Sequence, residues 1–264
     1  MQSLAQLFQQ RQKNSTELSY NEYLKRQCDA MNQSVGDLSD YDCPECRNKG
    51  YVYRIRGNEV VARECECMPL RDSIRRIKKS GLEGMLDTCT FDTFDTDDDW
   101  QKTMKQTALN FLDDTEGNWF YTGGQVGCGK THICTAIVGE FLRRGLASKY
   151  MVWSDEIVGI KANVTDESVY GRIMGKLKTI PVLYIDDLFK TATGTNPTAA
   201  DVKIAFEIFN ARYNDRKLIT VISSERSIGD LLEIDEAVGS RIYQRTKKYC
   251  LCISKDRKKN YRMR

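Results

Sequence analysis

Trp119-Phe-Tyr-Thr-Gly-Gly124-Gln-Val-Gly-Cys-Gly-Lys130-Thr131 is the stretch that decides the fold. Its first four residues favour a short β-strand. From Gly124 to Thr131 it matches the phosphate-loop pattern, in which a glycine and four further residues precede Gly-Lys-Thr. Apolar residues then recur at Ile133, Ile137 and Phe141, a spacing that predicts a helix. A strand, a glycine loop and a helix in this order indicate a site for nucleotide phosphates.

Each residue type in this loop has a chemical reason. Glycines let the backbone curl so that its amide groups point at phosphate oxygens, and the following helix adds the positive end of its dipole. We expect Lys130 to reach the β- and γ-phosphates, and the Thr131 hydroxyl to bind Mg²⁺. The predicted nucleotide-contacting residues are Gly124, Gln125, Val126, Gly127, Cys128, Gly129, Lys130, Thr131 and His132. A packing or surface role is also open to His132, the single histidine.

A second signal follows in Tyr184-Ile-Asp186-Asp187, where two carboxylates end the apolar run that starts at Pro181. Such a run is typical of a strand buried on both faces of a parallel sheet, and ligands bind at the carboxyl ends of those strands. Asp186 is expected to hold the Mg²⁺ shell, and Asp187 to orient or activate the attacking water. The alternative is an acidic pair that only caps a turn. The chain has no Asn-Lys-x-Asp sequence to read guanine, which favours ATP over GTP.

The region from residue 88 to the C-terminus alternates strands with helices. Helical spacing precedes the first strand at 100–112, and further strands are predicted at 149–153, 181–185, 218–222 and 249–253. Ser154 is predicted to cap the helix after the second of these strands. The alternation predicts an α/β fold with a doubly wound, parallel five-stranded sheet.

Composition limits the class of protein. The chain has 264 residues, 41% of them hydrophobic and 29% charged, which argues against a mainly disordered chain. We see neither a signal-peptide core nor a run long enough to cross a bilayer, so we expect a cytoplasmic protein with no membrane partner. The net charge of +3 identifies no partner. Basic blocks at 71–79 and 241–264 read as phosphate-tracking segments or as solvated helix faces.

Four of the ten cysteines form a cluster, Cys43-Pro-Glu-Cys46 and Cys65-Glu-Cys67, around a short segment with glycines at 50 and 57. Two tight pairs that bracket a hairpin can converge on one tetrahedral Zn²⁺, which would stabilise a module with little apolar core. Disulfides are the first alternative, but they are disfavoured in a reducing compartment. Unrelated buried thiols are the second, and the clustering disfavours them.

Together these motifs resemble the bacterial and phage helicase loaders of the DnaC/DnaI type, which are AAA+ ATPases. The resemblance runs from the cysteine cluster to the C-terminus. Its carriers are the two cysteine pairs, Ser80-Gly-Leu, Thr90-Phe-Asp-Thr-Phe94, the phosphate loop with His132, Ile185-Asp-Asp-Leu188, Ile222-Ser-Ser-Glu225, Gly239-Ser-Arg-Ile-Tyr-Gln-Arg245 and Asn260-Tyr-Arg262. It implies a helical, helicase-binding arm at 1–40, a four-cysteine zinc module at 41–70, a linker helix at 71–87 and the ATPase domain at 88–264.

The resemblance also implies catalytic roles. Glu225 stands where AAA+ proteins usually carry a polar sensor, often Asn; a carboxylate there would repel the γ-phosphate unless a water or cation intervenes. Arg241 and Arg245 are four residues apart and share a helical face, and one of them would be the arginine finger that reaches a neighbouring subunit's ATP. Arg262 matches the second sensor, which contacts the γ-phosphate of its own subunit. Surface ion pairing is the alternative for these arginines.

The implied function is a slow ATPase that assembles as a homo-oligomer, six subunits on one hexamer of a DnaB-type replicative helicase, and helps place that helicase on single-stranded DNA. The segment from Lys190 to Thr195 and the helix with Lys203 would lie near that DNA. Two other interpretations stay open. One is an IstB-like transposition helper with the same ATPase core, and the other is a zinc-dependent DNA-binding module with an inactive nucleotide site.

Overall fold

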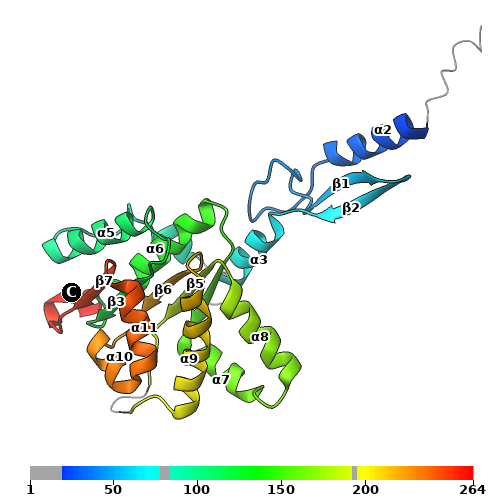
Figure 1. Ribbon diagram of the computed structural model, residues 1–264. Coiled ribbons are helices and arrows are strands. Elements are labelled where there is room, and N and C mark those ends of the chain that lie inside the picture. Colours follow the sequence, from blue (N-terminus) through cyan, green and yellow to red (C-terminus); the bar gives the residue numbers. More distant parts are fainter. Residues whose placement is uncertain (1–19, 78–83, 192–194, 264) are drawn as a thin grey trace, which may run out of the picture. The chain divides into compact units, whose positions relative to one another are not determined.

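The computed structural model describes residues 20–77, 84–191 and 195–263 (Figure 1). The chain divides into two compact units, the first ending at Arg71 and the second beginning at Asp72. Residues 1–19 of the predicted helical arm and the motif at Ser80 lie outside the described residues. No helix within the described ranges is long and apolar enough to cross a membrane.

The first unit combines a helix with a β-hairpin. It contains α2 (Tyr20–Gln33) and the antiparallel strands β1 (Tyr51–Arg56) and β2 (Glu59–Glu64), and α3 (Met68–Ile77) begins in it. The Asn32 side chain joins helix to hairpin: its Nδ2 donates to the Tyr53 carbonyl over 2.8 Å, and its Oδ1 accepts from the Tyr53 amide over 2.9 Å. Asn32 thus continues the strand ladder, because it pairs with both backbone groups of one residue.

The second unit contains a five-stranded parallel sheet, as predicted. Its strands are β3 (Phe120–Gly124), β4 (Ser148–Val152), β5 (Val182–Asp186), β6 (Ile219–Ser223) and β7 (Cys250–Ile253). Their spatial order is β4-β5-β6-β3-β7, and every neighbouring pair is parallel. Because β6 separates β3 from β5, the phosphate loop and Asp186 lie at the same edge of the sheet on either side of the end of β6. The α/β class and the parallel five-stranded sheet are those that the sequence predicts.

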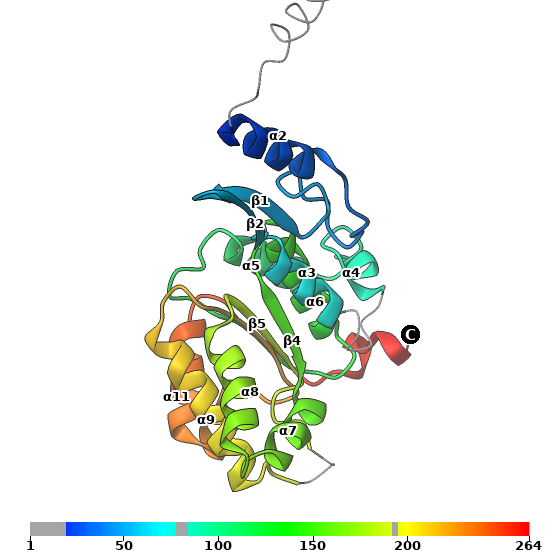
Figure 2. The same ribbon diagram turned by 90° about the vertical axis from the view of Figure 1, so that its right-hand side faces the viewer.

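Helices cover both faces of this sheet (Figures 1 and 2). One face carries α5 (Asp99–Phe111) and α6 (Lys130–Arg143), with α4 (Met85–Thr88) against α6. The other carries α7 (Trp153–Ala162), α8 (Glu167–Thr179), α9 (Ala199–Asn214), α10 (Ile228–Ile234) and α11 (Glu236–Thr246). Short turns η2 (Arg257–Lys259) and η3 (Tyr261–Met263) follow β7.

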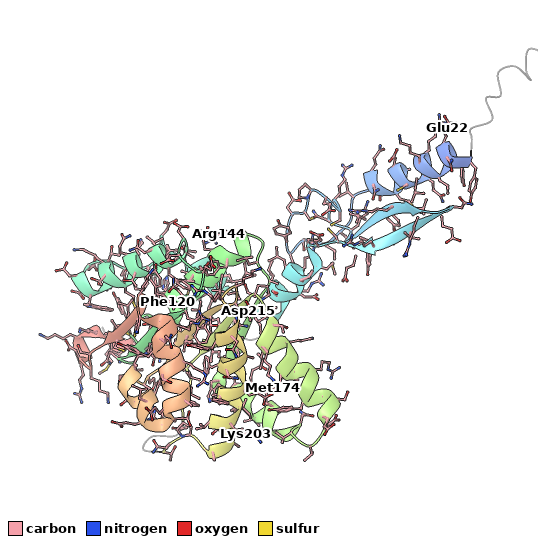
Figure 3. All side chains as sticks on the ribbon, in the orientation of Figure 1. Glu22, Phe120, Arg144, Met174, Lys203 and Asp215 are labelled. Atoms are coloured by element: carbon pink, nitrogen blue, oxygen red, sulfur yellow. The ribbon has the colours of Figure 1, made fainter. Side chains whose placement is uncertain are left out.

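Each face of the sheet has its own apolar core. Phe120 contacts the Phe111 ring on the first face, with ring centres 5.6 Å apart. Trp119 and Phe209 pack on the second face, with ring centres 5.8 Å apart. Figure 3 shows Phe120 and Met174 inside the second unit and Lys203 at its surface. The core thus fixes the sheet from both sides and leaves its carboxyl edge open for ligands.

One local prediction is wrong. Helix α7 begins at Trp153, so that Val152 rather than Ser154 occupies the N-cap position, and no side chain caps the helix. The Ser154 hydroxyl instead donates to Asp155 over 2.9 Å. The reason is that β4 passes into α7 without a loop, which leaves no polar residue at the junction.

Candidate nucleotide site and metal centre

The phosphate loop packs closely against β7 and the C-terminal segment. Gly124, Gly127 and Gly129 have φ of 94°, 72° and 87°, a left-handed backbone that glycine adopts without strain. A Cβ on Gly124 would lie 2.1 Å from the Ile253 carbonyl oxygen, and one on Gly127 would lie 1.9 Å from Oδ1 of Asn260. Glycine is therefore required at Gly124 for conformation and for space, and at Gly127 for conformation.

Lys130 begins α6 and is 7% exposed. Its ammonium donates to the carbonyl oxygens of Gly124, over 2.9 Å, and Gln125, over 2.7 Å. These acceptors are neutral and belong to the loop itself. The lysine charge therefore lies within the loop without a carboxylate partner among the described residues, and an anion is its natural counter-charge.

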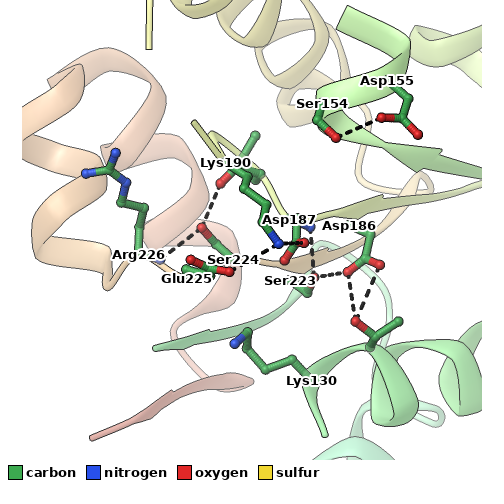
Figure 4. Close-up of polar contacts among 12 residues, drawn as sticks. Lys130, Ser154, Asp155, Asp186, Asp187, Lys190, Ser223, Ser224, Glu225 and Arg226 are labelled. Carbon is green, nitrogen blue, oxygen red and sulfur yellow. Dashed lines mark hydrogen bonds and ion pairs between the residues drawn. The ribbon is translucent and has the colours of Figure 1, made fainter. Parts of the chain in front are cut away.

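The structure brings together the two predicted Mg²⁺ ligands. Oγ1 of Thr131 lies 3.3 and 3.4 Å from the two carboxylate oxygens of Asp186. Asp186 also accepts from the Tyr150 hydroxyl over 2.8 Å. It accepts from the Ser223 hydroxyl as well (Figure 4). A threonine hydroxyl beside a carboxylate is an all-oxygen donor set of the kind that Mg²⁺ prefers. These residues fit the ion.

Sequence reasoning assigned no role to Tyr150 or Ser223. Ser223 was part of the Ile-Ser-Ser-Glu motif, but nothing in the sequence marks Tyr150, which reaches Asp186 from the adjacent strand β4. Burial, followed by the negative charge of Asp186, raises the pKa of Tyr150, so its hydroxyl keeps its proton and acts as a donor.

A charged trio completes this edge. The Lys190 ammonium lies 2.6 Å from Oδ2 of Asp187 and 3.2 Å from Oε1 of Glu225. The hydrogen bond to Asp187 is the largest cause of a raised pKa at Lys190, and burial opposes it. The sequence predicted that Glu225 would repel a γ-phosphate unless a cation intervened. Lys190, absent from the predicted catalytic residues, is such a cation.

A cavity of about 190 Å³ lies at this edge of the sheet. Its lining combines loop, acidic and basic residues: Met85, Cys89, Val126, Gly127, Gly129, Lys130, Thr131, His132, Asp187, Lys190, Glu225 and Arg262. Of the predicted nucleotide-contacting and catalytic residues, the phosphate loop, Asp187, Glu225 and Arg262 are thus brought to one place, and Asp186 lies beside Thr131.

Two segments distant in sequence are tied to the loop. His132 Nε2 lies 2.9 Å from the Thr90 carbonyl oxygen, and its ring meets the edge of Phe94. The Tyr261 amide donates to the Gly127 carbonyl over 2.9 Å. The Asp256 amide donates to Oε1 of Gln125 over 2.8 Å. His132 thus joins the loop helix to residues 90–94, and the C-terminal turns place Arg262 in the cavity.

Arg241 and Arg245 lie on α11 and are not among the described residues that line this cavity. Arg245 donates to the carbonyls of Gly117 and Tyr213, and its own carbonyl accepts from the Trp119 amide, at the amino end of β3. Arg241 donates to Asn210 over 3.1 Å and lies over the Phe206 ring. The phosphate loop is at the opposite end of β3, so neither arginine serves the site of its own subunit in this structure.

The four clustered cysteines converge in the first unit. Their sulfurs all lie within 4.8 Å of one another, with Cys43 to Cys65 at 3.8 Å and Cys46 to Cys67 at 3.6 Å. Four sulfurs placed about 2.3 Å from a central zinc ion stand about 3.8 Å apart, so the cluster has the size of a Cys₄ site. All ten cysteines lie in the described ranges and are free thiols, which excludes the disulfide alternative here.

Hydrogen-bond donors surround these sulfurs. Burial opposes ionisation of Cys46, but the Gly50 amide, 3.4 Å from its sulfur, and the neighbouring thiols lower its pKa to about 6. Nε of the fully buried Arg71 lies 3.4 Å from the Cys67 sulfur, and its Nη2 donates to Asn48 over 2.8 Å. Arg71 thus offsets thiolate charge, although its sequence position in a basic block suggested a solvated face or a phosphate contact.

The family of IstB-like ATP-binding proteins matches residues 44–264, which is most of the chain and includes the whole nucleotide site and three of the four clustered cysteines. The chain belongs to this family. Two Bacillus subtilis relatives, the phage-like element PBSX protein XkdC and the uncharacterized protein YqaM, are 31% and 27% identical to it. The XkdC match covers 82% of this chain and 84% of the relative, and the YqaM match covers 84% and 85%.

Helicase loaders are similar to the chain at lower identity. The Escherichia coli replicative helicase loader DnaC is 23% identical over 49% of this chain and 53% of its own. Among solved structures, a DnaC helicase loader has a TM-score of 0.56 at 24% identity and covers 64% of this chain and 98% of its own, and a DnaI structure has 0.51 at 18%, covering 66% and 92%. The structural likeness establishes the shared fold. The predicted resemblance to AAA+ proteins of the DnaC/DnaI type is confirmed.

The metal centre generates a direct prediction. Purified full-length protein is expected to hold one zinc ion per chain by elemental analysis, and Cys46→Ser is expected to lose nearly all of it, because three thiolates and a hydroxyl bind zinc far more weakly. Cys252→Ser, which removes an exposed thiol in the other unit, is the matched control and should keep its zinc. Zinc-free wild-type protein, or full occupancy in Cys46→Ser, would contradict this assignment.

Proposed function

We propose that this IstB-like ATP-binding protein is an ATP-dependent loader of a DnaB-type replicative helicase. The observation that carries the proposal is the single cavity in which the phosphate loop, Asp187 and Arg262 meet beside the Thr131–Asp186 pair. The names of the DnaC relatives, replicative helicase loaders, support the choice of helicase. An intact site speaks against a module with an inactive nucleotide pocket.

Each site residue has a separate role in the proposed hydrolysis of ATP. The Lys130 ammonium exchanges its neutral carbonyl partners for the β- and γ-phosphates, a stronger, charge-assisted interaction. Thr131 and Asp186 would hold Mg²⁺, and the bound ion would neutralise charge on the phosphates. Asp187 accepts a proton from, or orients, the attacking water, and Arg262 contacts the γ-phosphate from the C-terminal turn. The remaining transition-state charge needs a further cation.

We assign that cation to Arg241 of a neighbouring subunit in a homo-oligomer. Arg245 is held by two backbone carbonyls and the face of Tyr213, so its guanidinium supports the amino end of β3. Arg241 has the Asn210 side chain and the Ala237 carbonyl as partners and is half-buried over the rings of Phe206 and Tyr213. These contacts all lie on α9 and α11, so Arg241 is not tied to the backbone before β3 as Arg245 is. Hydrolysis would be slow in a single subunit and faster in the assembly.

The helicase would be bound by the first unit. Tyr20 and Tyr23 on α2 stack with ring centres 6.5 Å apart and are 58% and 55% exposed. Exposed aromatic side chains are enriched at the centres of protein interfaces. Single-stranded DNA is the second proposed partner, supported by the fold shared with a DnaA structure whose title names bound single-stranded DNA. That likeness, at 21% identity and a TM-score of 0.53, concerns the fold.

Helicase binding is tested by light scattering after size-exclusion chromatography of full-length protein with the replicative helicase of its source, ATP and Mg²⁺. We expect a large complex that is lost in a Tyr20→Ser, Tyr23→Ser double variant and retained in Tyr243→Ser, which changes an exposed tyrosine of the second unit. Intact ATP binding without any complex for the wild type would contradict the loader and favour the IstB-like transposition helper.

The arginine finger is tested by mixing two inactive variants. Lys130→Ala removes ATP binding and keeps Arg241, whereas Arg241→Ala keeps the site and removes the finger. Each alone should hydrolyse ATP far more slowly than the wild type, and an equal mixture should regain about a quarter of wild-type activity, because that share of neighbouring pairs combines both intact parts. A mixture no more active than either variant, with assembly preserved, would contradict the assignment.

A further inference from the structure

Glu225 stands in a position that is electrostatically unfavourable for a triphosphate site. It follows β6, the strand between the phosphate-loop strand β3 and the Asp186 strand β5, and it lines the cavity. Its side chain is 38% exposed, and in a partly buried site like charges are screened less than in water. A carboxylate here without a neighbouring cation would repel the γ-phosphate more strongly than the α- or β-phosphate.

The fold supplies a cation directly against this carboxylate. The Lys190 ammonium is shared between Glu225 at 3.2 Å and Asp187 at 2.6 Å. Lys190 also lines the cavity, on the same side as both carboxylates (Figure 4). One lysine thus offsets part of the negative charge of two acids, and its removal would leave both carboxylates unscreened where the phosphates would enter.

The backbone fixes where Lys190 points. Asp187 and Phe189 have φ of 54° and 57°, and the Lys190 amide donates to the Asp187 carbonyl over 2.9 Å. Leu188 between them is fully buried; its amide donates to the Ser223 carbonyl over 2.9 Å, and its carbonyl accepts from the Ser224 hydroxyl over 2.7 Å. Two left-handed residues held against β6 make a tight turn that returns Lys190 to the cavity. An ordinary solvent-facing lysine would not need this turn.

We propose that Lys190 is a positioning residue that screens Glu225 and Asp187, and so gives the site its preference for nucleoside triphosphates over diphosphates. The inference rests on the proposed binding of ATP at this cavity. Without Lys190, the charge of Glu225 would act on the γ-phosphate unscreened. The affinity for ATP would therefore fall, and the affinity for ADP, which has no γ-phosphate, would change little. If Lys190 only stabilised the turn, its removal would weaken the binding of ATP and of ADP alike. Neutralising Glu225 would then not restore the lost affinity.

The test is the affinity of full-length protein for ATP and for ADP, measured by calorimetric titration with Mg²⁺. We expect Lys190→Met to weaken ATP binding about tenfold and ADP binding less than twofold. Lys190→Arg, which keeps the charge, should stay near wild type. The Lys190→Met, Glu225→Gln double variant should recover most of the lost ATP affinity, since the repelling charge is gone. Lys176→Met, an exposed lysine in the last turn of α8, is the control.

The outcomes separate this inference from the function on which it rests. If Lys190→Met weakened the binding of ATP and of ADP equally, or if the double variant recovered no ATP affinity, the proposed role of Lys190 would be wrong. Binding of ATP by the wild type would still support the nucleotide site. Wild-type protein that binds neither nucleotide would overturn the proposed function itself. Thermal unfolding without nucleotide shows that each variant is folded, and Lys190→Arg together with Glu225→Gln keeps the test valid if Lys190→Met unfolds.

Discussion

The carboxylate of Asp186 receives hydroxyl donors from three different elements: Thr131 of α6, Tyr150 of β4 and Ser223 of β6. Asp186 is 6% exposed, and a buried carboxylate is tolerated only where such donors replace water. The requirement fixes the relative positions of the loop helix and of the ends of three strands. Loss of any donor would leave a charge under-solvated and the metal ligands displaced.

The phosphate loop is constrained in a second way, by the chain that returns to it. The Ile253 carbonyl and the Asn260 side chain occupy the space that Cβ atoms on Gly124 and Gly127 would need. Residues far apart in sequence therefore share one compact site, and the C-terminal turns belong to the nucleotide pocket. This explains how Arg262, in a basic stretch that resembles a solvated surface, comes to line the cavity.

Local patterns predicted much of this fold. The central strands were recognisable because a strand buried on both faces must be continuously apolar, as 181–185 is. The phosphate loop and the paired cysteines have fixed spacings that a single segment carries. Tyr150, Lys190 and Arg71 could not be assigned in this way, because their roles come from neighbours brought close by the fold: a parallel strand, a tight turn and a cluster of sulfurs. The predicted cap at Ser154 was wrong because β4 passes directly into α7, and a rule based on local sequence cannot show where a strand ends in this way.

The most direct measurement is a crystal structure of the full-length protein with Mg²⁺ and a non-hydrolysable ATP analogue. The account predicts that the triphosphate lies in the loop from Gly124 to Thr131, that the Lys130 ammonium leaves the carbonyls of Gly124 and Gln125 for the phosphates, and that Mg²⁺ is held by Thr131 and Asp186. A nucleotide bound elsewhere, with Lys130 still on those two carbonyls, would contradict it.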